Sequence, residues 1–352
     1  MFYPLIRSLL FTLPAEQAHH ISMRCLSVAC AIPPLKRMIA QCCRFPGDKG
    51  KNVFGLPFRN PVGLGAGFDK NAAYLRELKA LDFGFVEIGT VTPLPQKGNQ
   101  RPRLFRLPAD RALINRMGFN NDGMDAVKRR LAKWNDEEGT AEENKMIIGG
   151  NIGKNKVTAN EEAWKDYLRV FRHLHGEADY FVINVSSPNT PGLRALQEKE
   201  ALVKITGMLQ EFNQGQTKPK PLLLKIAPDL SSGQLDDIVD LTRKIPLSGL
   251  VATNTTIERN MLSKNSLLKS DQIGAGGLSG APLRSMSVHV LQYLKANLGN
   301  EIPVISSGGI MSEADALERF DLGAELIQIW TGFIYNGPFF VKKIGQAMQS
   351  SE

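Results

Sequence analysis

Short apolar runs alternate with amphipathic segments from residue 53 onward. Eight of the runs read as strands buried on both faces, and they lie at residues 62–67, 85–90, 146–150, 180–186, 222–227, 249–254, 303–307 and 326–331. Segments with helical spacing lie between them, at residues 72–81, 122–134, 161–175, 197–212, 232–244, 284–298 and 312–320, and a last one follows at 337–348. Eight such units predict an α/β fold, a (β/α)8 TIM barrel.

A doubly wound open sheet is the structural alternative, because it also alternates strands with helices. The number of strand runs and the lack of a G-x-G-x-x-G turn after the first strand both weigh against it. The barrel is therefore the preferred prediction.

The segment before the barrel, residues 1–51, has a different pattern. Apolar residues recur at helical spacing up to Leu13, Pro14 opens a second helical run, and Pro33-Pro34 ends that run. We expect a small N-terminal two-helix extension. Its apolar face either packs on the barrel or faces a membrane, and the pattern alone favours neither.

The distribution of charge along the chain favours the membrane alternative. The chain has a net charge of +8, and residues 1–51 contribute +5 of it, from seven basic and two acidic residues. The basic residues alternate with apolar ones, which suits an anionic membrane surface, and no nucleic-acid recognition motif accompanies them. No run approaches the ~20 apolar residues that a membrane-spanning helix needs. All four cysteines lie in the first 43 residues, and their spacing is not that of a zinc site, so we expect reduced thiols.

Polar residues follow nearly every predicted strand. In a barrel, the side chains at the carboxyl ends of the strands form the functional face. These polar positions are Asp69, Lys70, Thr90, Asn151, Asn184–Asn189, Lys225, Thr253–Thr255, Ser307 and Thr331. Asparagine both donates and accepts hydrogen bonds, which suits a planar ligand rich in carbonyl and N–H groups. Clustered His, Cys and carboxylate residues are lacking there, so we expect no metal.

Glycines mark the exits of the last two strands. Gly308-Gly309 and Thr331-Gly332 stand where barrels often bind phosphate, and Ser279-Gly280 could add backbone N–H groups. Each glycine alone could be an ordinary turn residue. Their joint position favours a phosphate site.

Long motifs carry a family resemblance. The segment 184–194 (NVSSPNTPGLR) is similar to the active-site loop of dihydroorotate dehydrogenases. Further segments resemble the same family in the same order: 63–70 (GLGAGFDK), 87–93 (EIGTVTP), 115–121 (NRMGFNN), 225–230 (KIAPDL), 252–256 (ATNTT) and 276–282 (GGLSGAP). The resemblance covers essentially the whole chain. The serine at the position of the catalytic base, with the N-terminal extension, resembles the membrane-associated, quinone-using class 2.

The resemblance implies an FMN-dependent oxidoreductase of de novo pyrimidine biosynthesis. Such a flavoprotein oxidises (S)-dihydroorotate to orotate, with one FMN per chain and a membrane quinone as electron acceptor. A hydride goes to flavin N5 and a proton goes to a serine base. Residues 1–51 would form the membrane and quinone-tunnel segment, and residues 52–352 the FMN-binding barrel.

Residue roles follow from the same resemblance. The catalytic residues would be Ser187 as the base, Thr190 and Phe119 beside its proton path, and Lys225 beside the flavin ring. The flavin-binding residues would be Ala66, Gly67, Lys70, Thr90, Asn151, Asn184, Lys225, Thr253, Ser279, Gly280, Gly308, Gly309, Trp330 and Thr331. The substrate-binding residues would be Lys70, Asn115, Arg116, Met117, Gly118, Phe119, Asn184, Asn189, Asn254 and Thr255. His19, Arg106 and Trp330 would line the quinone tunnel.

Several alternatives stay open. Apart from the family match, Ser187 could be a hydroxyl that caps a turn, and His19 could be an exposed histidine beside His20. Trp330 replaces the tyrosine that is usual in the family, and Ser306-Ser307 replaces a small apolar pair. Enzymes of the same fold that use a soluble acceptor generally carry a cysteine base, and a non-catalytic ligand-binding barrel is a further possibility. We expect a monomer, peripheral on the cytoplasmic face of the inner membrane if the source is bacterial.

Overall fold

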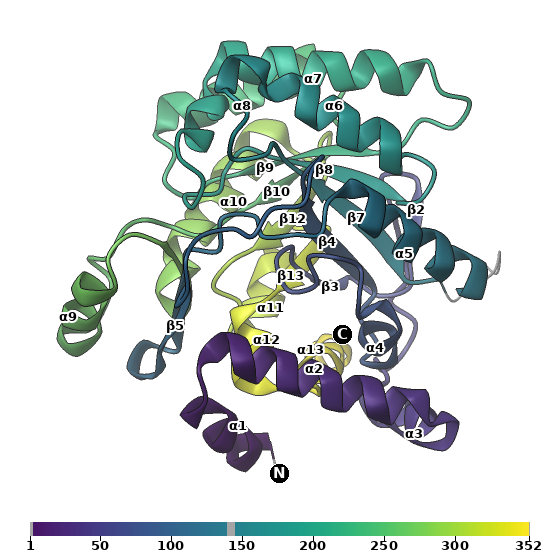
Figure 1. Ribbon diagram of the computed structural model, residues 1–352, viewed down its shortest axis with the longest axis vertical. Helices are drawn as coiled ribbons and strands as arrows, with labels where there is room; N and C mark the ends of the chain where they lie inside the picture. The colour runs from purple at the N-terminus through teal and green to yellow at the C-terminus, as the bar shows by residue number, and fades with distance from the viewer. Residues whose placement is uncertain (1–2, 139–144, 352) are drawn as a thin grey trace.

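The computed structural model describes residues 3–138 and 145–351 and contains the predicted barrel (Figure 1). Its eight parallel strands form a closed ring in chain order. They are β3 (Val62–Leu64), β4 (Phe85–Val91), β7 (Ile147–Ile152), β8 (Tyr180–Asn184), β9 (Leu222–Ile226), β10 (Gly249–Ala252), β12 (Val304–Ser307) and β13 (Leu326–Ile329). Each overlaps one predicted run, so the TIM-barrel prediction is confirmed.

Helices surround this ring. The predicted ones are α4 (Leu75–Ala80), α5 (Met124–Glu138), α6 (Ala163–Leu174), α7 (Lys199–Gln214), α8 (Ser232–Lys244), α10 (Arg284–Leu298), α11 (Glu313–Asp321) and α13 (Phe340–Ser350). α6 shows why they form, because Tyr167, Phe171 and Leu174 recur on one face and are all buried. α8 begins at a capping box in which Ser231 and Gln234 satisfy each other's backbone N–H groups. Two further helices, α9 (Lys264–Ile273) and α12 (Thr331–Asn336), were not predicted.

A hairpin closes the amino-terminal end of the barrel. It consists of β1 (Lys51–Val53) and β2 (Leu56–Phe58), and Val53 and Phe58 pack into the apolar cluster inside the ring. The rings of Phe58 and Phe85 meet edge to face with centroids 5.3 Å apart. Ligands therefore have to reach the barrel from its other end.

The barrel interior changes from apolar to polar along the strands. Side chains point inward at every second residue, so the apolar layer that contains Phe85, Leu223 and Leu326 is followed by Glu87, Lys225 and Gln328. Trp330 follows directly after the last strand, two residues beyond Gln328, and lines the cavity described below. The same alternation that fills the barrel thus delivers its functional side chains to one end.

The extension contains three helices where the sequence predicted two: α1 (Tyr3–Thr12), α2 (Ala15–Ala31) and α3 (Pro33–Cys43). Pro33-Pro34 does end α2, but it also occupies the first turn of α3. Proline is tolerated there because backbone N–H groups in the first turn of a helix make no hydrogen bond within the helix. α1 contacts α12, α2 contacts α4 and β5, and α3 contacts α4, so the three helices lie against one end of the barrel (Figure 1). Of the helices that the structure describes, none is both long and apolar enough to cross a bilayer. The boundary expected between residues 51 and 52 falls at the start of β1.

A small antiparallel sheet stands beside the mouth of the barrel. Its strands are β5 (Leu104–Leu107), β6 (Ala112–Asn115) and β11 (Gly277–Gly280), in the order β11-β6-β5. The sheet was not predicted, because its strands are short and all three lie in predicted loops of the barrel. It matters for the site, since Asn115 and Ser279 reach the cavity from it.

Candidate active site

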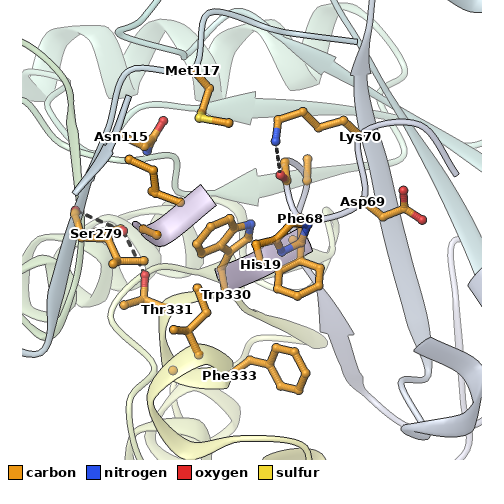
Figure 2. Close-up of a pocket in the computed structure, with 18 of the residues that line it drawn as sticks. His19, Phe68, Asp69, Lys70, Asn115, Met117, Ser279, Trp330, Thr331 and Phe333 are labelled. Carbon is orange, nitrogen blue, oxygen red and sulfur yellow. Dashed lines mark hydrogen bonds between the residues drawn. The ribbon is translucent and has the colours of Figure 1, made fainter. Parts of the chain in front are cut away.

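One cavity of about 650 Å³ lies at the carboxyl ends of the barrel strands and continues between the barrel and helices α1 and α2. Most of the predicted site residues line it, and Figure 2 shows several of them around the same space. The lining residues are His19, Ala66, Gly67, Lys70, Thr90, Arg106, Asn115, Met117, Gly118, Phe119, Asn184, Ser187, Asn189, Lys225, Thr253, Asn254, Thr255, Ser279, Gly280, Gly308, Gly309, Trp330 and Thr331. Asn151 and Thr190 are buried and do not line it. The guanidinium of Arg116 turns away, donating to the carbonyls of Ile273 and Pro102.

A buried carboxylate, Glu87, holds the floor of the cavity together. It is 0% exposed and accepts hydrogen bonds from Lys225 Nζ (3.1 Å), Asn151 Nδ2 (2.7 Å) and Gln328 Nε2 (2.5 Å). Lys225 is thereby fixed with its charge compensated and its side chain at the cavity wall. Sequence reasoning gave Glu87 no role, although a carboxylate inside an otherwise apolar strand was a usable signal.

Replacing Glu87 with Gln is expected to lower the free energy of unfolding by about 3 kcal/mol. The change leaves the Lys225 ammonium buried without a counter-charge, and breaking a buried pair on one side typically costs about 3–5 kcal/mol. The measurement is urea unfolding of the full chain. Glu137→Gln is the matched control, because the Lys133–Glu137 pair is exposed, and we expect a change below about 0.5 kcal/mol there. Equal denaturation midpoints for both variants would contradict the structural role.

Amide side chains form a hydrogen-bonding surface above this floor. Asn184 Nδ2 donates to Thr90 Oγ1 at 2.9 Å and to Asn151 Oδ1 at 3.0 Å, which orients the Asn184 amide. Asn189 Nδ2 donates to Asn115 Oδ1 at 2.9 Å, joining the loop after β8 to β6. The buried Asn189 Oδ1 has no partner among the described residues. Such oriented donors and acceptors can recognise a flat ligand with several amide groups.

Ser187 lies in the loop after β8, with only 6% of its surface exposed. Its Oγ accepts a hydrogen bond from the backbone N–H of Asn189 at 3.3 Å, as a turn-capping hydroxyl would. The residue also lines the cavity together with Phe119, whose φ of 52° is in the left-handed region. Thr190 is buried nearby in sequence, and its Oγ1 has no partner among the described residues. The two interpretations of Ser187 are therefore compatible in this geometry.

Lys70 supplies a second cation to the cavity. Its Nζ donates to the carbonyl oxygen of Gly67 at 2.7 Å (Figure 2). Burial, and secondarily the positive charge of Arg103, lower the pKa of Lys70 to about 8, while Glu16 and Asp69 oppose this shift. An anionic ligand in the cavity would favour the protonated ammonium. Lys70 is thus suited to bind a carboxylate.

The glycine-rich end of the cavity can accept an anion. Gly308 and Gly309 have φ values of 104° and 72°, which side chains rarely adopt. A Cβ on Gly309 would lie 2.5 Å from the backbone nitrogen of Arg284, the first residue of α10, so only glycine allows this approach. Ser279 Oγ and Thr331 Oγ1 lie 2.9 Å apart on the same wall (Figure 2). Hydroxyls and backbone N–H groups at a helix N-terminus are the usual ligands of a phosphate.

The part of the cavity beneath the N-terminal helices is apolar and aromatic. The His19 ring packs edge to face on Phe68 with centroids 4.7 Å apart, and Phe68 in turn contacts Trp330 (Figure 2). His19 is therefore not the freely exposed histidine of the alternative interpretation. The Arg106 guanidinium donates to the carbonyl of Leu13 at 2.7 Å and lies over the Phe11 ring, so it anchors the end of α1.

Burial of His19 predicts a loss of stability in mild acid. Burial, and then the charge of Lys70, lower the pKa of His19 from 6.5 to about 3. Between these values the unfolded chain binds a proton that the folded chain does not, so stability falls as the pH drops below 6.5. Between pH 7.5 and pH 5 this contribution amounts to about 2 kcal/mol.

Urea unfolding at the two pH values tests this expectation. His19→Gln should reduce the difference in unfolding free energy by that amount, whereas the exposed neighbour variant His20→Gln should not. If His19→Gln keeps the wild-type difference, the imidazole does not lose its proton on folding.

Comparisons with known proteins give a consistent result. The family model described as dihydroorotate dehydrogenase matches residues 50–351. "Dihydroorotate dehydrogenase (quinone)" of Christiangramia forsetii is 46% identical over 347 residues, which cover 98% of each chain. The protein of the same name from Gloeobacter violaceus is 47% identical over 345 residues, covering 97% of this chain and 92% of the relative. The crystal structure of DHODH from Eimeria tenella in complex with ferulenol superposes with a TM-score of 0.83 at 36% identity, covering 96% of this chain and 91% of that one.

Proposed function

This chain belongs to the quinone-dependent dihydroorotate dehydrogenase family, and from that membership we propose that it oxidises dihydroorotate to orotate in pyrimidine biosynthesis and passes the electrons to a quinone. The observation that carries the proposal is the single cavity that joins Ser187, Lys225 and Lys70 to the N-terminal helices. It offers a polar end for dihydroorotate and an apolar end for a quinone.

The residues present fit FMN. Gly308, Gly309, Ser279 and Thr331 would hold the phosphate at the glycine-rich end, and Lys225 would lie beside the ring system. A volume of about 650 Å³ is within the range of cofactor sites. Bound FMN would supply a carrier that accepts a hydride from the substrate and later gives two electrons to the quinone. Lys225, fixed by Glu87, would place an ammonium group where negative charge develops, and the Glu87 carboxylate would offset part of the resulting stabilisation.

Substrate binding would use the polar surface above the floor. The Lys70 ammonium would pair with the carboxylate, and the amides of Asn115, Asn184, Asn189 and Asn254 would pair with the amide edges of the ring. A site that hydrogen-bonds these edges rejects analogues that lack them. Arg116 would contribute only its backbone, because its guanidinium is engaged outside the cavity.

Ser187 would take the proton that leaves the substrate carbon. A hydroxyl is a weak base, so it has to release its own proton as it accepts one. The buried Thr190 hydroxyl has no partner among the described residues and is available for such a relay. The alternative of a soluble acceptor with a cysteine base is disfavoured, since all four cysteines lie in α2 and α3.

The N-terminal helices would bring the enzyme to a membrane as a peripheral protein. They bury few residues, and Leu5 and Leu9 on α1 and Val28 on α2 are 72%, 70% and 61% exposed. Lys36 and Arg37 add positive charge on α3. Exposed apolar residues beside cations suit a helix that lies in an anionic membrane surface. A quinone from that surface would reach the cavity past His19 and Phe68.

Anaerobic stopped-flow mixing tests the proposal. The purified, FMN-loaded chain is mixed with dihydroorotate, and the flavin absorbance is followed before and after addition of a short-chain quinone. We expect bleaching by dihydroorotate and recolouring by the quinone. Bleaching without recolouring would keep the dehydrogenase and remove the acceptor. A chain that takes up no flavin would overturn the central proposal.

A further inference from the structure

Arg319 is a fully buried cation behind the glycine turn that follows β12. It belongs to α11, its side chain is 0% exposed, and it does not line the cavity. Its Nη2 donates to Ser287 Oγ at 2.9 Å and to the carbonyl oxygen of Gly308 at 3.1 Å. The guanidinium therefore touches the turn from the side opposite to the cavity.

The positive charge of Arg319 is poorly compensated. Its Nε and Nη1 have no hydrogen-bond partner among the described residues. The two carboxylates whose charges act on Arg319, Glu318 and Asp315, form ion pairs with Arg284 instead, at 2.8 Å and 2.7 Å. Burial, only partly opposed by those carboxylates, lowers the pKa of Arg319 to about 10. A buried cation without a close counter-ion is costly, so a further negative charge nearby would stabilise it.

The cavity side of the same turn is where an anion fits. Gly308 and Gly309 line the cavity there, and Ser279 and Thr331 place hydroxyl groups beside them. An anion at this place would face Arg319 across one layer of backbone. Arg319 itself is 0% exposed, so its charge is not in contact with water. Charges interact strongly under those conditions even when they do not touch.

We propose that Arg319 is the counter-charge of the flavin phosphate and sets the preference of the site for FMN over unphosphorylated flavin. The inference rests on the proposed function, because it assumes that FMN binds with its phosphate at the Gly308–Gly309 turn. Arg319 acts through that turn as a positioning and electrostatic residue. A purely structural role, in which the Nη2 bond only holds the turn, is the alternative.

The two roles differ in how they affect riboflavin. If Arg319 only shapes the turn, its loss weakens the binding of FMN and of riboflavin by the same factor. If its charge attracts the phosphate, its loss weakens the binding of FMN and leaves the binding of riboflavin unchanged. The ratio of the two dissociation constants therefore separates charge from shape.

The experiment titrates full-length apoprotein with FMN and with riboflavin and follows the quenching of flavin fluorescence. Arg319→Gln removes the charge but keeps N–H donors for Gly308 and Ser287. We expect the riboflavin-to-FMN ratio of dissociation constants to fall by about tenfold or more in this variant. Arg319→Lys keeps the charge and should retain most of the ratio. Arg129→Met removes an exposed cation from α5 and should leave the ratio unchanged.

Each outcome assigns a cause. A wild-type chain that binds riboflavin as tightly as FMN would overturn the phosphate placement in the proposed function. A wild-type preference for FMN that survives unchanged in Arg319→Gln would overturn the role of Arg319 and leave the function intact. If the Gln variant does not fold, Arg319→Met, which removes the charge without a buried amide, is titrated in the same way and judged by the same ratio.

Discussion

Replacing Ser187 with alanine is expected to slow flavin reduction by dihydroorotate roughly 10²–10⁴-fold, while FMN stays bound. The expected size is that of a lost general base. FMN should remain because Lys225 and the groups proposed to hold the FMN phosphate come from other strands and loops. Among the described residues, the buried Ser187 hydroxyl hydrogen-bonds only the backbone N–H of Asn189, in its own loop. The two events, binding and reduction, therefore separate in this variant.

Anaerobic stopped-flow gives the reduction rate, and the flavin absorbance of the purified variant gives its FMN content. Ser187→Cys is the matched control, because a thiol of similar size can also accept a proton. We expect its rate to lie between those of the wild type and the alanine variant. An alanine variant that reduces its flavin at the wild-type rate would leave Ser187 with the turn-capping role alone.

Removal of residues 1–32 is expected to slow flavin reoxidation by quinone about 100-fold or more and to change reduction by dihydroorotate much less. This deletion takes away α1 and α2, which form one wall of the cavity around His19, and keeps α3. α3 should stay in place because Cys43 and Phe45 belong to the main core. The acceptor would then have no positioned path to the flavin.

Two full-length variants refine this test. Ala18→Trp fills the cavity from α2, since Ala18 is only 5% exposed and lines it, and should slow reoxidation alone. Glu16→Gln removes the 2.7 Å ion pair with the buried Arg103, which connects α2 to the loop before β5. If Glu16→Gln clearly slows flavin reduction by dihydroorotate, the helices act on the substrate end too. Equal losses of both half-reactions in Ala18→Trp would argue against separate ends.

The barrel was predictable because each strand is buried on both faces. Runs such as 249–254 and 326–331 contain no charged residue, and helices of clear periodicity separate the strand runs. The strand exits were predictable for the same reason, since alternation fixes which residues point inward. That logic brought Asn184, Lys225 and Trp330 to one cavity.

A carboxylate in the apolar run 85–90 set Glu87 apart in the sequence, but the partners of Glu87 and of Arg319 were not predictable. Glu87 accepts hydrogen bonds from Lys225 and Gln328, which are far away in sequence. Arg319 donates to the carbonyl oxygen of Gly308, in the turn after β12. Short strands were not predicted either. β11, for example, is a strand because it pairs with β6 across the fold, and its own residues show no alternating hydrophobic pattern that would predict it. Pro33-Pro34 ends α2 and also begins α3, and only the end of α2 was predicted.

The confinement of the thiols to the N-terminal helices makes the chain ready for site-directed labelling. Cys25 and Cys42 are exposed, whereas Cys30 and Cys43 are buried, and burial raises the pKa of the Cys43 thiol to about 11. Maleimide reagents attack thiolates, so the two exposed positions should react first. A nitroxide or an environment-sensitive dye attached there would report depth and orientation on a lipid vesicle, with the catalytic barrel left chemically untouched.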